Sequence, residues 1–143
     1  MFDRLVKDVM ERKYAQTLSP STTVSKAAEM MARKKIGAVM VVDNERLVGV
    51  FSERDALFRV IARGLDARTT RLAEVMTAEP KTVGPNTSYG YALVLMQENG
   101  FRHAPVIESG KPIGMVSSRN AMDPELEEFV SEANRREHIR LDR

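Results

Sequence analysis

The stretch LVGVFSERDA at residues 47–56 is repeated with conservative changes as PIGMVSSRNA at residues 112–121. At the same offset (47 to 112, or 65 residues), residues 17–57 align with residues 82–122 without a gap. Ten aligned pairs are identical, whereas chance predicts about two or three at average composition. These pairs are Thr17/Thr82, Pro20/Pro85, Thr22/Thr87, Ala27/Ala92, Met31/Met96, Val41/Val106, Gly49/Gly114, Ser52/Ser117, Arg54/Arg119 and Ala56/Ala121. The chain therefore contains two copies of one structural unit.

Each unit has the same predicted order of helices and strands. Apolar residues at helical spacing predict a first helix after a Ser/Thr-rich N-cap. They are Val24, Ala27, Ala28 and Met31 in the first unit, and Tyr89, Ala92, Leu93 and Met96 in the second. Two short apolar runs (39–42 and 47–51 in the first unit) predict a β-hairpin. A second helix is expected from about Ser52 to Gly64.

The pattern predicts an α/β (α+β) fold of two β-α-β-β-α units. One unit of about 50 residues has only a marginal core, so the two are expected to pack together with pseudo-twofold symmetry. We expect the first unit, with an N-terminal segment, at 1–63 and a polar linker at 64–71. The second unit is expected at 72–122 and a C-terminal helix and tail at 123–143. Leu126, Phe129, Val130 and Ala133 would form an apolar stripe on that helix.

Composition narrows the functional classes. The chain has no cysteine, which excludes disulfides, thiolate nucleophiles and cysteine-ligated zinc. Its two histidines, His103 and His138, are too few and too far apart to suggest a metal site. No phosphate-loop motif and no pairing of nucleophile with base is present, so no catalytic residue, cofactor or enzymatic activity is expected. No apolar run approaches the roughly 20 residues of a membrane span, which predicts a soluble, cytoplasmic protein.

The duplicated arrangement resembles a pair of cystathionine-β-synthase (CBS) domains, also called a Bateman module, from about residue 9 to 122. The carriers are Val9-Met10, Val75-Met76-Thr77, 36–39 (IGAV), 102–106 (RHAPV) and the two stretches quoted first. This resemblance implies a regulatory binding module rather than a catalyst. It also implies an adenosine-containing ligand (AMP, ADP, ATP, S-adenosylmethionine or NAD) in clefts between the units, and a homodimer that signals to a regulated protein.

The family's ribose and phosphate motif matches Gly49, Ser52 and Asp55, with Arg54 beside them. A carboxylate accepts hydrogen bonds from ribose hydroxyls, and a hydroxyl beside a helix start suits phosphate. The same Ser-x-x-acid spacing is also that of a helix capping box, so capping and ligand binding both stay open. In the second unit the acid is replaced by Asn120, a neutral and weaker acceptor.

The resemblance divides the candidate site residues between two clefts. The first cleft is expected to hold Ser52, Arg54, Asp55, Thr82, Val83, Arg102, His103, Ala104 and Pro105. The second cleft, expected to bind more weakly, would hold Thr17, Leu18, Ala38, Val39, Ser117, Arg119 and Asn120. The first is favoured because it has the acidic motif and two basic side chains, where the second has Asn120 and Gly37-Ala38.

Two other functions compete with a nucleotide sensor. One is a pure interaction module that leaves the clefts unused and docks a partner or a second subunit through the 126–130 stripe. The other is nucleic-acid binding through Arg33-Lys34-Lys35, Arg59, Arg63, Arg68 and Arg71. A net charge of only +2, with acidic residues among these basic ones, argues against nucleic acid.

Overall fold

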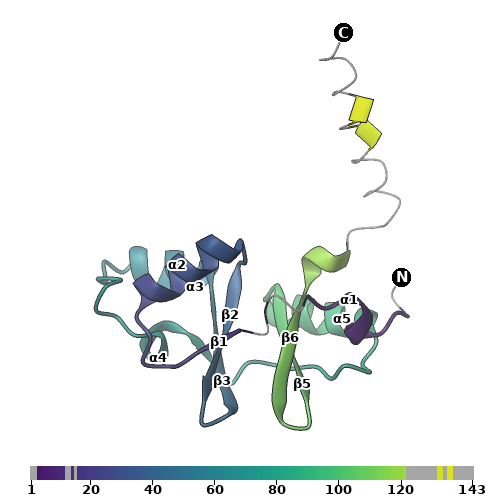
Figure 1. The fold of residues 1–143 in the computed structure, drawn as a ribbon, viewed down its shortest axis with the longest axis horizontal. Helices are drawn as coiled ribbons and strands as arrows, with labels where there is room; N and C mark the ends of the chain where they lie inside the picture. The colour runs from purple at the N-terminus through teal and green to yellow at the C-terminus, as the bar shows by residue number, and fades with distance from the viewer. Residues whose placement is uncertain (1–2, 12–13, 15, 122–131, 134, 137–143) are drawn as a thin grey trace.

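The equivalent strands β3 (Arg46–Ser52) and β6 (Lys111–Ser117) contact each other at the centre of the molecule. The computed structural model describes residues 3–11, 14, 16–121, 132–133 and 135–136. Figure 1 shows the two units side by side, with helices on the outside of each hairpin. The predicted mixed fold with two repeated units is confirmed.

The first unit is built on a four-stranded sheet in the order β1-β2-β3-β4. β1 (Thr17–Leu18) runs parallel to β2 (Ala38–Asp43), and β2 and β3 form the predicted antiparallel hairpin. α2 (Val24–Lys34) connects β1 to β2, and the Thr23 hydroxyl at its N-cap accepts a hydrogen bond from the Lys26 N–H. The periodic residues Val24, Ala27 and Met31 are buried as expected, because they form the face of α2 that meets the sheet.

The second unit repeats this plan. α5 (Tyr89–Asn99) is capped by the Ser88 hydroxyl, which accepts from the Tyr91 N–H, and it leads into the antiparallel hairpin of β5 (His103–Glu108) and β6. Single bridges extend this sheet at both edges: Val83 pairs with Val106, and Glu11 pairs with Met115. A short 3-10 helix, η3 (Ser118–Ala121), follows β6.

The opening segments of the two units are exchanged. α1 (Val6–Val9) lies at the start of the chain but packs beside α5, as Figure 1 shows, and its Val6 belongs to the core of the second unit. Conversely, α4 (Leu72–Val75) contributes Leu72 and Val75 to the core of the first unit, and β4 (Thr77–Ala78) pairs with β3. Sequence order places the N-terminal segment in the first unit (1–63), whereas Val6 and Met10 belong to the core of the second unit and only Tyr14, among the described core residues before β1, belongs to that of the first.

This exchange explains why Val-Met pairs and strand glycines occur together in both repeats. A Cβ at Gly49 of β3 would lie 2.4 Å from the Sδ of Met76, and a Cβ at Gly114 of β6 would lie 3.3 Å from the Sδ of Met10. Each methionine therefore packs on the backbone of the other unit's central strand. Only glycine permits so close an approach at position 49 without a shift of the thioether.

The second helix of the first unit differs from the predicted one. It starts at Ser52 as expected, but after α3 (Glu53–Asp55) it continues as a π-helix, η2 (Ala56–Ile61). Bonds such as Ala62 N–H to Leu57 O (2.9 Å) span five residues instead of four. The wider turn changes which side chains face the core. Val60 is 1% exposed, whereas the apolar Leu57 and Ile61 are 51% and 69% exposed.

The polar segment 64–71 is held against the first unit rather than spanning free space. The N–H groups of Val24 and Ser25 donate to the carbonyls of Thr70 and Ala67, each at 2.9 Å. Leu126, Phe129 and Val130 of the predicted C-terminal stripe lie outside the described residues. Further along the chain, the described residues 132–133 and 135–136 are helical.

Candidate functional site

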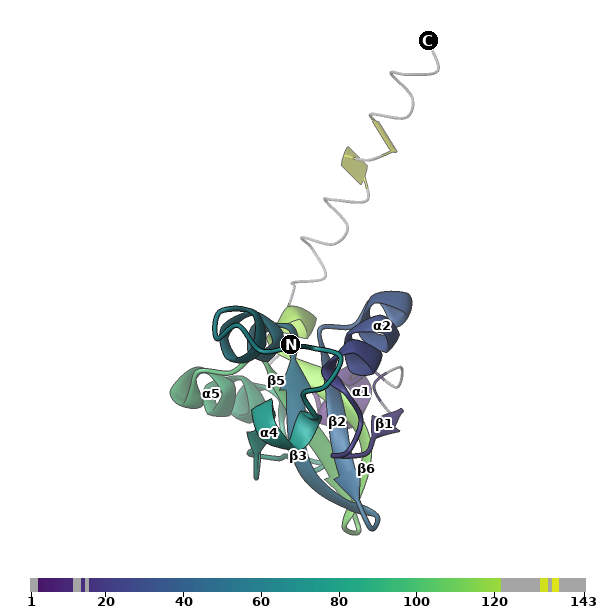
Figure 2. The same ribbon diagram turned by 90° about the vertical axis from the view of Figure 1, so that its left-hand side faces the viewer.

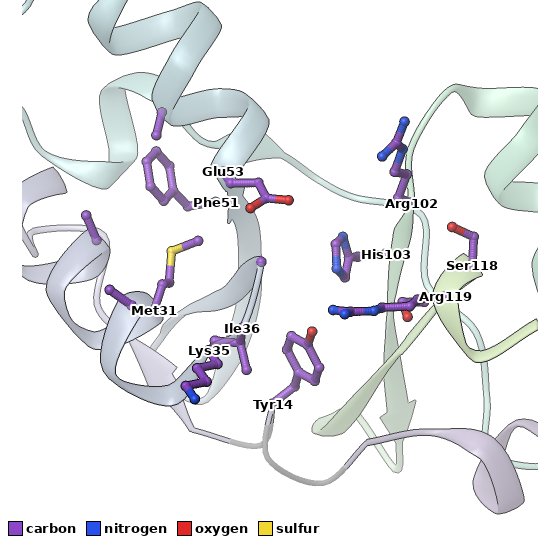
Figure 3. A pocket seen from close by; sticks show the side chains of 15 residues that line it. Tyr14, Met31, Lys35, Ile36, Phe51, Glu53, Arg102, His103, Ser118 and Arg119 are labelled. Carbon is purple, nitrogen blue, oxygen red and sulfur yellow. The ribbon is translucent and has the colours of Figure 1, made fainter. Parts of the chain in front are cut away.

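A crevice of about 750 Å³ opens between the two units. Figure 3 shows side chains from both units projecting into it, with Tyr14 at its base. Its lining residues, which define the inter-unit crevice, are Tyr14, Ala28, Met31, Ala32, Lys35, Ile36, Gly37, Phe51, Glu53, Ala56, Arg102, His103, Ser117, Ser118 and Arg119. A cavity of this volume is within the range of small-molecule sites in proteins, roughly 300–1,000 Å³.

Gly37, Glu53 and His103 meet in the lining of the crevice. The Glu53 N–H donates to the Gly37 carbonyl at 2.9 Å, which places the start of α3 beside the residue that precedes β2. A Cβ at Gly37 would lie 3.3 Å from Glu53 Oε1 and 3.6 Å from His103 Cε1. The missing side chain at position 37 therefore makes room for a carboxylate from the first unit and an imidazole from the second. In Figure 3 these two side chains face each other.

Tyr14 closes the base of the crevice. Its ring is 4% exposed and lies 5.9 Å from the His103 ring, centroid to centroid, at an interplanar angle of 53°. Burial, assisted by the nearby Glu11 carboxylate, raises the pKa of Tyr14, and a backbone hydrogen bond with Gly37 opposes this effect. The Tyr14 phenol therefore stays protonated at neutral pH and offers an aromatic surface to the cavity.

Burial lowers the pKa of His103 below its ordinary value of 6.5. The carboxylates of Glu53 and Glu11 act in the opposite direction, and the Arg102 guanidinium adds to the lowering. Because burial is the largest of these effects, the imidazole is neutral at pH 7, when one ring nitrogen donates and the other accepts.

The mouth of the crevice carries more positive than negative side chains. Lys35 comes from the C-terminal cap of α2, Arg102 precedes β5, and Arg119 lies in η3, whereas Glu53 is the one carboxylate among the lining residues. Arg102 and Arg119 are both exposed, so they can move toward a ligand. This balance favours an anionic ligand, and guanidinium groups suit phosphate because they donate two hydrogen bonds in one plane.

The Asp55 carboxylate faces its own backbone. Its Oδ2 accepts hydrogen bonds from the Ser52 N–H (2.9 Å) and the Ser52 hydroxyl (3.1 Å), and Ser52 Oγ in turn accepts from the Asp55 N–H. Its Oδ1 lies 3.5 Å from Nε of Arg59. The capping box predicted from Ser-x-x-acid spacing is confirmed. Asp55 is 7% exposed and does not line the inter-unit crevice.

Asn120 makes the equivalent contacts in the second unit. Its Oδ1 accepts from the Ser117 N–H at 2.9 Å and from the Ser117 hydroxyl at 3.2 Å. The neutral amide thus replaces the carboxylate as the cap. The Tyr89 side chain also stabilises this turn, because its hydroxyl donates to the Ser117 carbonyl at 2.8 Å. Burial raises the pKa of Tyr89 to about 12, so the hydroxyl remains a donor.

The crevice draws on both predicted clefts. Of the first set it includes Arg102 and His103, and of the second it includes Ser117 and Arg119. The remaining candidates line other places or none. Thr82 borders a smaller cavity of about 380 Å³ with Arg46 and Glu79. Five candidates are buried in or beside the strands: Val83, Ala38, Val39, Ala104 and Pro105. Neither cavity lining includes the candidates Ser52, Arg54, Thr17, Leu18 and Asn120.

Tyr14, Lys35 and Glu53 are among the crevice residues that sequence reasoning missed. Tyr14 lies in a segment without periodic pattern, and Lys35 is set by its left-handed backbone (φ 55°) at the end of α2. Glu53 occupies a variable position of the Gly-x-x-Ser motif. Its signal was the asymmetry between Glu53 and its repeat partner Ser118, which places a carboxylate on one side only.

In the part of the chain that the structure describes, no group of three or more histidine, aspartate or glutamate side chains could hold a metal ion. Among the same described residues, no helix has the length and apolar character needed to cross a bilayer.

The capping geometry makes a stability prediction with a matched control. Asp55→Ala should lower the free energy of unfolding by about 1–2 kcal/mol, because the Ser52 N–H and the Ser52 hydroxyl lose their acceptor. Asp55→Asn should cost much less, because Asn120 already accepts the same two bonds in the second unit. Urea denaturation of the three proteins measures this difference. Equal destabilisation by both substitutions would contradict the capping role.

Comparison with known proteins points to one family. The family model for the CBS domain matches residues 6–62 and again residues 72–124. A CBS domain-containing protein of Bacillus subtilis, YhcV, is 35% identical over 112 residues, covering 78% of this chain and 79% of its own length. The chain spans only 14% of a Schizosaccharomyces pombe relative, the meiotically up-regulated gene 70 protein (38% identical over 101 residues, 70% of this chain). It spans 57% of the mitochondrial CBSX3 protein of Arabidopsis thaliana (36% identical over 118 residues, 79% of this chain).

Solved structures share the fold. A putative signal-transduction protein with CBS domains from Burkholderia ambifaria superposes with a TM-score of 0.77 at 32% identity, covering 82% of this chain and 90% of that one. A hexameric CBS-CP12 protein from bloom-forming cyanobacteria gives 0.77 at 26% identity, over 85% and 70% of the two chains. A CBS domain protein of Pyrobaculum aerophilum, solved in complex with AMP, gives 0.74 at 21% identity, over 90% and 99%.

Proposed function

The chain belongs to the CBS domain family, and we propose that it is a regulatory module that binds an adenosine nucleotide in the inter-unit crevice. The observation that carries this proposal is a cavity of about 750 Å³ lined by both units, with Arg102, His103 and Arg119 at its mouth. CBS pairs are generally regulatory rather than catalytic. The complex of the Pyrobaculum aerophilum protein with AMP supports a ligand of this class for the shared fold.

The crevice offers a separate environment for each part of such a ligand. Met31, Ile36 and Phe51 form an apolar inner wall beside the Tyr14 ring, which suits a flat purine base. The basic mouth suits phosphate. Ser117, the last residue of β6, also lines the crevice, and we propose its hydroxyl oxygen as an acceptor for the ribose. The role of Asp55 as a ribose acceptor stays a prediction from the sequence, because this carboxylate caps its own helix and lies outside the lining of the crevice.

The net positive charge of the crevice lining predicts which adenosine compounds bind most tightly. Lys35, Arg102 and Arg119 outnumber the Glu53 carboxylate, so AMP, ADP, ATP and NAD should bind better than S-adenosylmethionine, whose sulfonium is cationic. Each added phosphate charge strengthens the attraction, which is expected to weaken in high salt because the mouth is open to solvent.

A ligand held by both units can act as a signal. Contacts to Met31 and Glu53 come from the first unit, and contacts to Arg102 and Arg119 from the second. The ligand shifts the packing of the units only to the extent that it binds one arrangement better than another. We propose that a partner protein responds to this shift. The cytoplasmic location expected from the sequence stays a prediction.

The module is also proposed to form a homodimer. Among the residues that the structure describes, six large apolar side chains are exposed, on η2, in the segment after it and on α5: Leu57, Phe58, Ile61, Leu65, Tyr91 and Val94. Arg54 links the two regions, because its Nη1 donates to the Gly100 carbonyl at the end of α5 (3.4 Å) and its guanidinium lies 5.5 Å from the Phe58 ring centroid. In Figure 2 α5 lies on the side of the molecule opposite α2. The cyanobacterial CBS-CP12 protein with the same fold is hexameric, which supports self-association of this chain.

A thermal-shift panel tests the proposed ligand class. At about 100 times its Kd, a ligand adds roughly 2.7 kcal/mol of stability, which raises the Tm of a chain of this size by about 5–10 °C. We expect ADP and ATP to give the largest increases, AMP and NAD smaller ones, and S-adenosylmethionine and UDP little or none. The absence of any shift with all the adenosine nucleotides at millimolar concentration would refute the proposed function.

A further inference from the structure

The imidazole of His103 is the one titratable ring at the seam between the units that has no hydrogen-bond partner among the described residues. Its backbone is fixed in β5, where His103 pairs with Ser117 of β6. Its side chain reaches out of its own unit to within 3.6 Å of the Cβ position of Gly37, and it contacts the Tyr14 ring face at a tilt. Figure 3 shows the ring directed into the crevice, between Glu53 and Arg119.

Charged groups from several elements surround this ring. Glu53 approaches from α3, Glu11 from the segment after α1, and Arg102 from the residue before β5. Arg119 of η3 and Lys35 at the end of α2 line the same cavity, and the Tyr14 phenol lies beneath the ring. In the free protein the imidazole therefore lies among carboxylate and guanidinium groups. Among the described residues, none of these carboxylates forms a hydrogen bond or an ion pair with the ring.

We propose that His103 takes up a proton when an anionic nucleotide occupies the inter-unit crevice, so that nucleotide affinity increases as the pH falls. This inference rests on the proposed function and adds a regulatory input to the same site. A phosphate group placed among Arg102, His103 and Arg119 neutralises the two guanidinium groups and presents oxygen acceptors to the imidazole. Both changes favour the doubly protonated ring, which donates from each nitrogen.

The direction of the effect follows from linkage. In the free protein burial keeps the pKa of His103 below 6.5, so the ring is neutral at pH 7. A bound anion raises that pKa. Between the two values, binding takes up a fraction of a proton and the affinity rises as the pH falls through the higher value. Below the lower value both states are protonated and the affinity levels off. If the ligand raises the pKa by one unit, the total gain is about tenfold.

Only the second unit has a histidine at this position of the repeat, so the pH response comes from His103 alone. Position 38, the repeat partner of His103, is Ala38, and position 37, the partner of Arg102, is Gly37. The second unit therefore supplies the titrating group and the first unit supplies the space that accommodates it. Gly37→Ala should displace the Glu53 carboxylate slightly, because the new Cβ would lie 3.3 Å from Glu53 Oε1, whereas its 3.6 Å distance from His103 Cε1 is an ordinary contact.

Proton NMR of the full chain tests the proposal directly. The chain has two histidines, so the Cε1–H region contains two signals, and His138→Gln assigns them. We expect His103 to titrate below pH 6.5 in the free protein and about one unit higher with saturating ADP. His103 titrating at the same pH with and without bound ADP would overturn the proposal.

Calorimetry supplies an independent readout. Titration of ADP at pH 6.5 in two buffers with different ionisation enthalpies gives the number of protons taken up. Wild type should take up more protons than His103→Gln, a comparison that cancels the titration of ADP itself. Equal uptake by the two proteins would overturn the proton-linked role while leaving nucleotide binding intact. No heat of binding with wild type would instead refute the proposed function, and this inference with it.

Discussion

Replacement of both Arg102 and Arg119 by alanine is expected to weaken ADP binding by about a hundredfold to ten-thousandfold. Each guanidinium makes charge-assisted hydrogen bonds to phosphate, worth roughly 1.5–3 kcal/mol apiece, and 1.4 kcal/mol corresponds to a tenfold change in Kd. The two residues flank the open end of the β5–β6 hairpin, Arg102 just before β5 and Arg119 shortly after β6, and both line the inter-unit crevice. Isothermal titration calorimetry measures the loss.

The effect must be separated from a change in net charge. Arg68→Ala combined with Arg136→Ala removes the same two charges from exposed positions, where the guanidinium groups pair with the surface carboxylates of Asp66 and Glu132. This control should bind ADP within about twofold of wild type, because surface charges at such distances are screened. Both arginines of the crevice are exposed, so their replacement should leave the Tm of the free protein nearly unchanged. An affinity loss as large in the control as in Arg102→Ala/Arg119→Ala would contradict the proposed site.

Phe58→Glu is expected to convert the protein from a dimer to a monomer. Phe58 is 56% exposed in the single chain and lies among other exposed apolar side chains of the same face, including Ile61 at 69% and Tyr91 at 60%. A carboxylate at its place would have to be desolvated in a dimer, at a cost on the order of several kcal/mol for each copy that the neighbouring Arg54 guanidinium offsets only in part. Sedimentation velocity should show the mass fall from about 32 kDa (2 × 16.1 kDa) to 16.1 kDa.

Arg33→Gln provides the matched control for this substitution. It lowers the net charge by the same one unit but lies on α2, on the other side of the molecule in Figure 2. Arg33→Gln should remain dimeric. Circular dichroism should show that Phe58→Glu keeps its secondary structure, because the side chain is not part of either core cluster. A wild-type chain that sediments as a monomer, or a dimeric Phe58→Glu, would contradict a dimer through this face.

The helices and strands of both units follow from local sequence patterns. Val24, Ala27 and Met31 mark the buried face of α2 because helical spacing brings them together, and Thr23 and Ser88 cap helices as their side chains favour. The π-helical turn at η2 was not foreseeable from spacing, because its five-residue bonds depend on how the segment packs over Val75 and Met76, to whose carbonyls Arg59 donates.

The exchange of opening segments lies beyond sequence periodicity. The repeat shows that Val9-Met10 and Val75-Met76 are equivalent, but it carries no information about which unit each pair covers. The contacts of Met76 with Gly49 and of Met10 with Gly114 decide this, and they are tertiary. Likewise, the sequence-based prediction placed Arg102 and His103 in one cleft and Ser117 and Arg119 in the other, on an assumed symmetry, whereas all four line the one inter-unit crevice. Gly37 and His103 break that symmetry.

The Ser-x-x-acid motif shows why one pattern can support two functions. Its spacing satisfies a helix start in both units, with Asp55 in one and Asn120 in the other. Capping therefore explains the motif without a ligand. What distinguishes a binding site is the cavity beside it, and the large cavity lies next to Ser117 rather than next to Asp55.

A crystal structure of the full chain with ADP measures the central claim most directly. We predict one ADP per chain in the inter-unit crevice, with the base against Tyr14 and the phosphates within hydrogen-bond distance of Arg102, His103 and Arg119. Electron density for ADP at another surface, with the crevice occupied only by solvent at a saturating ADP concentration, would contradict it.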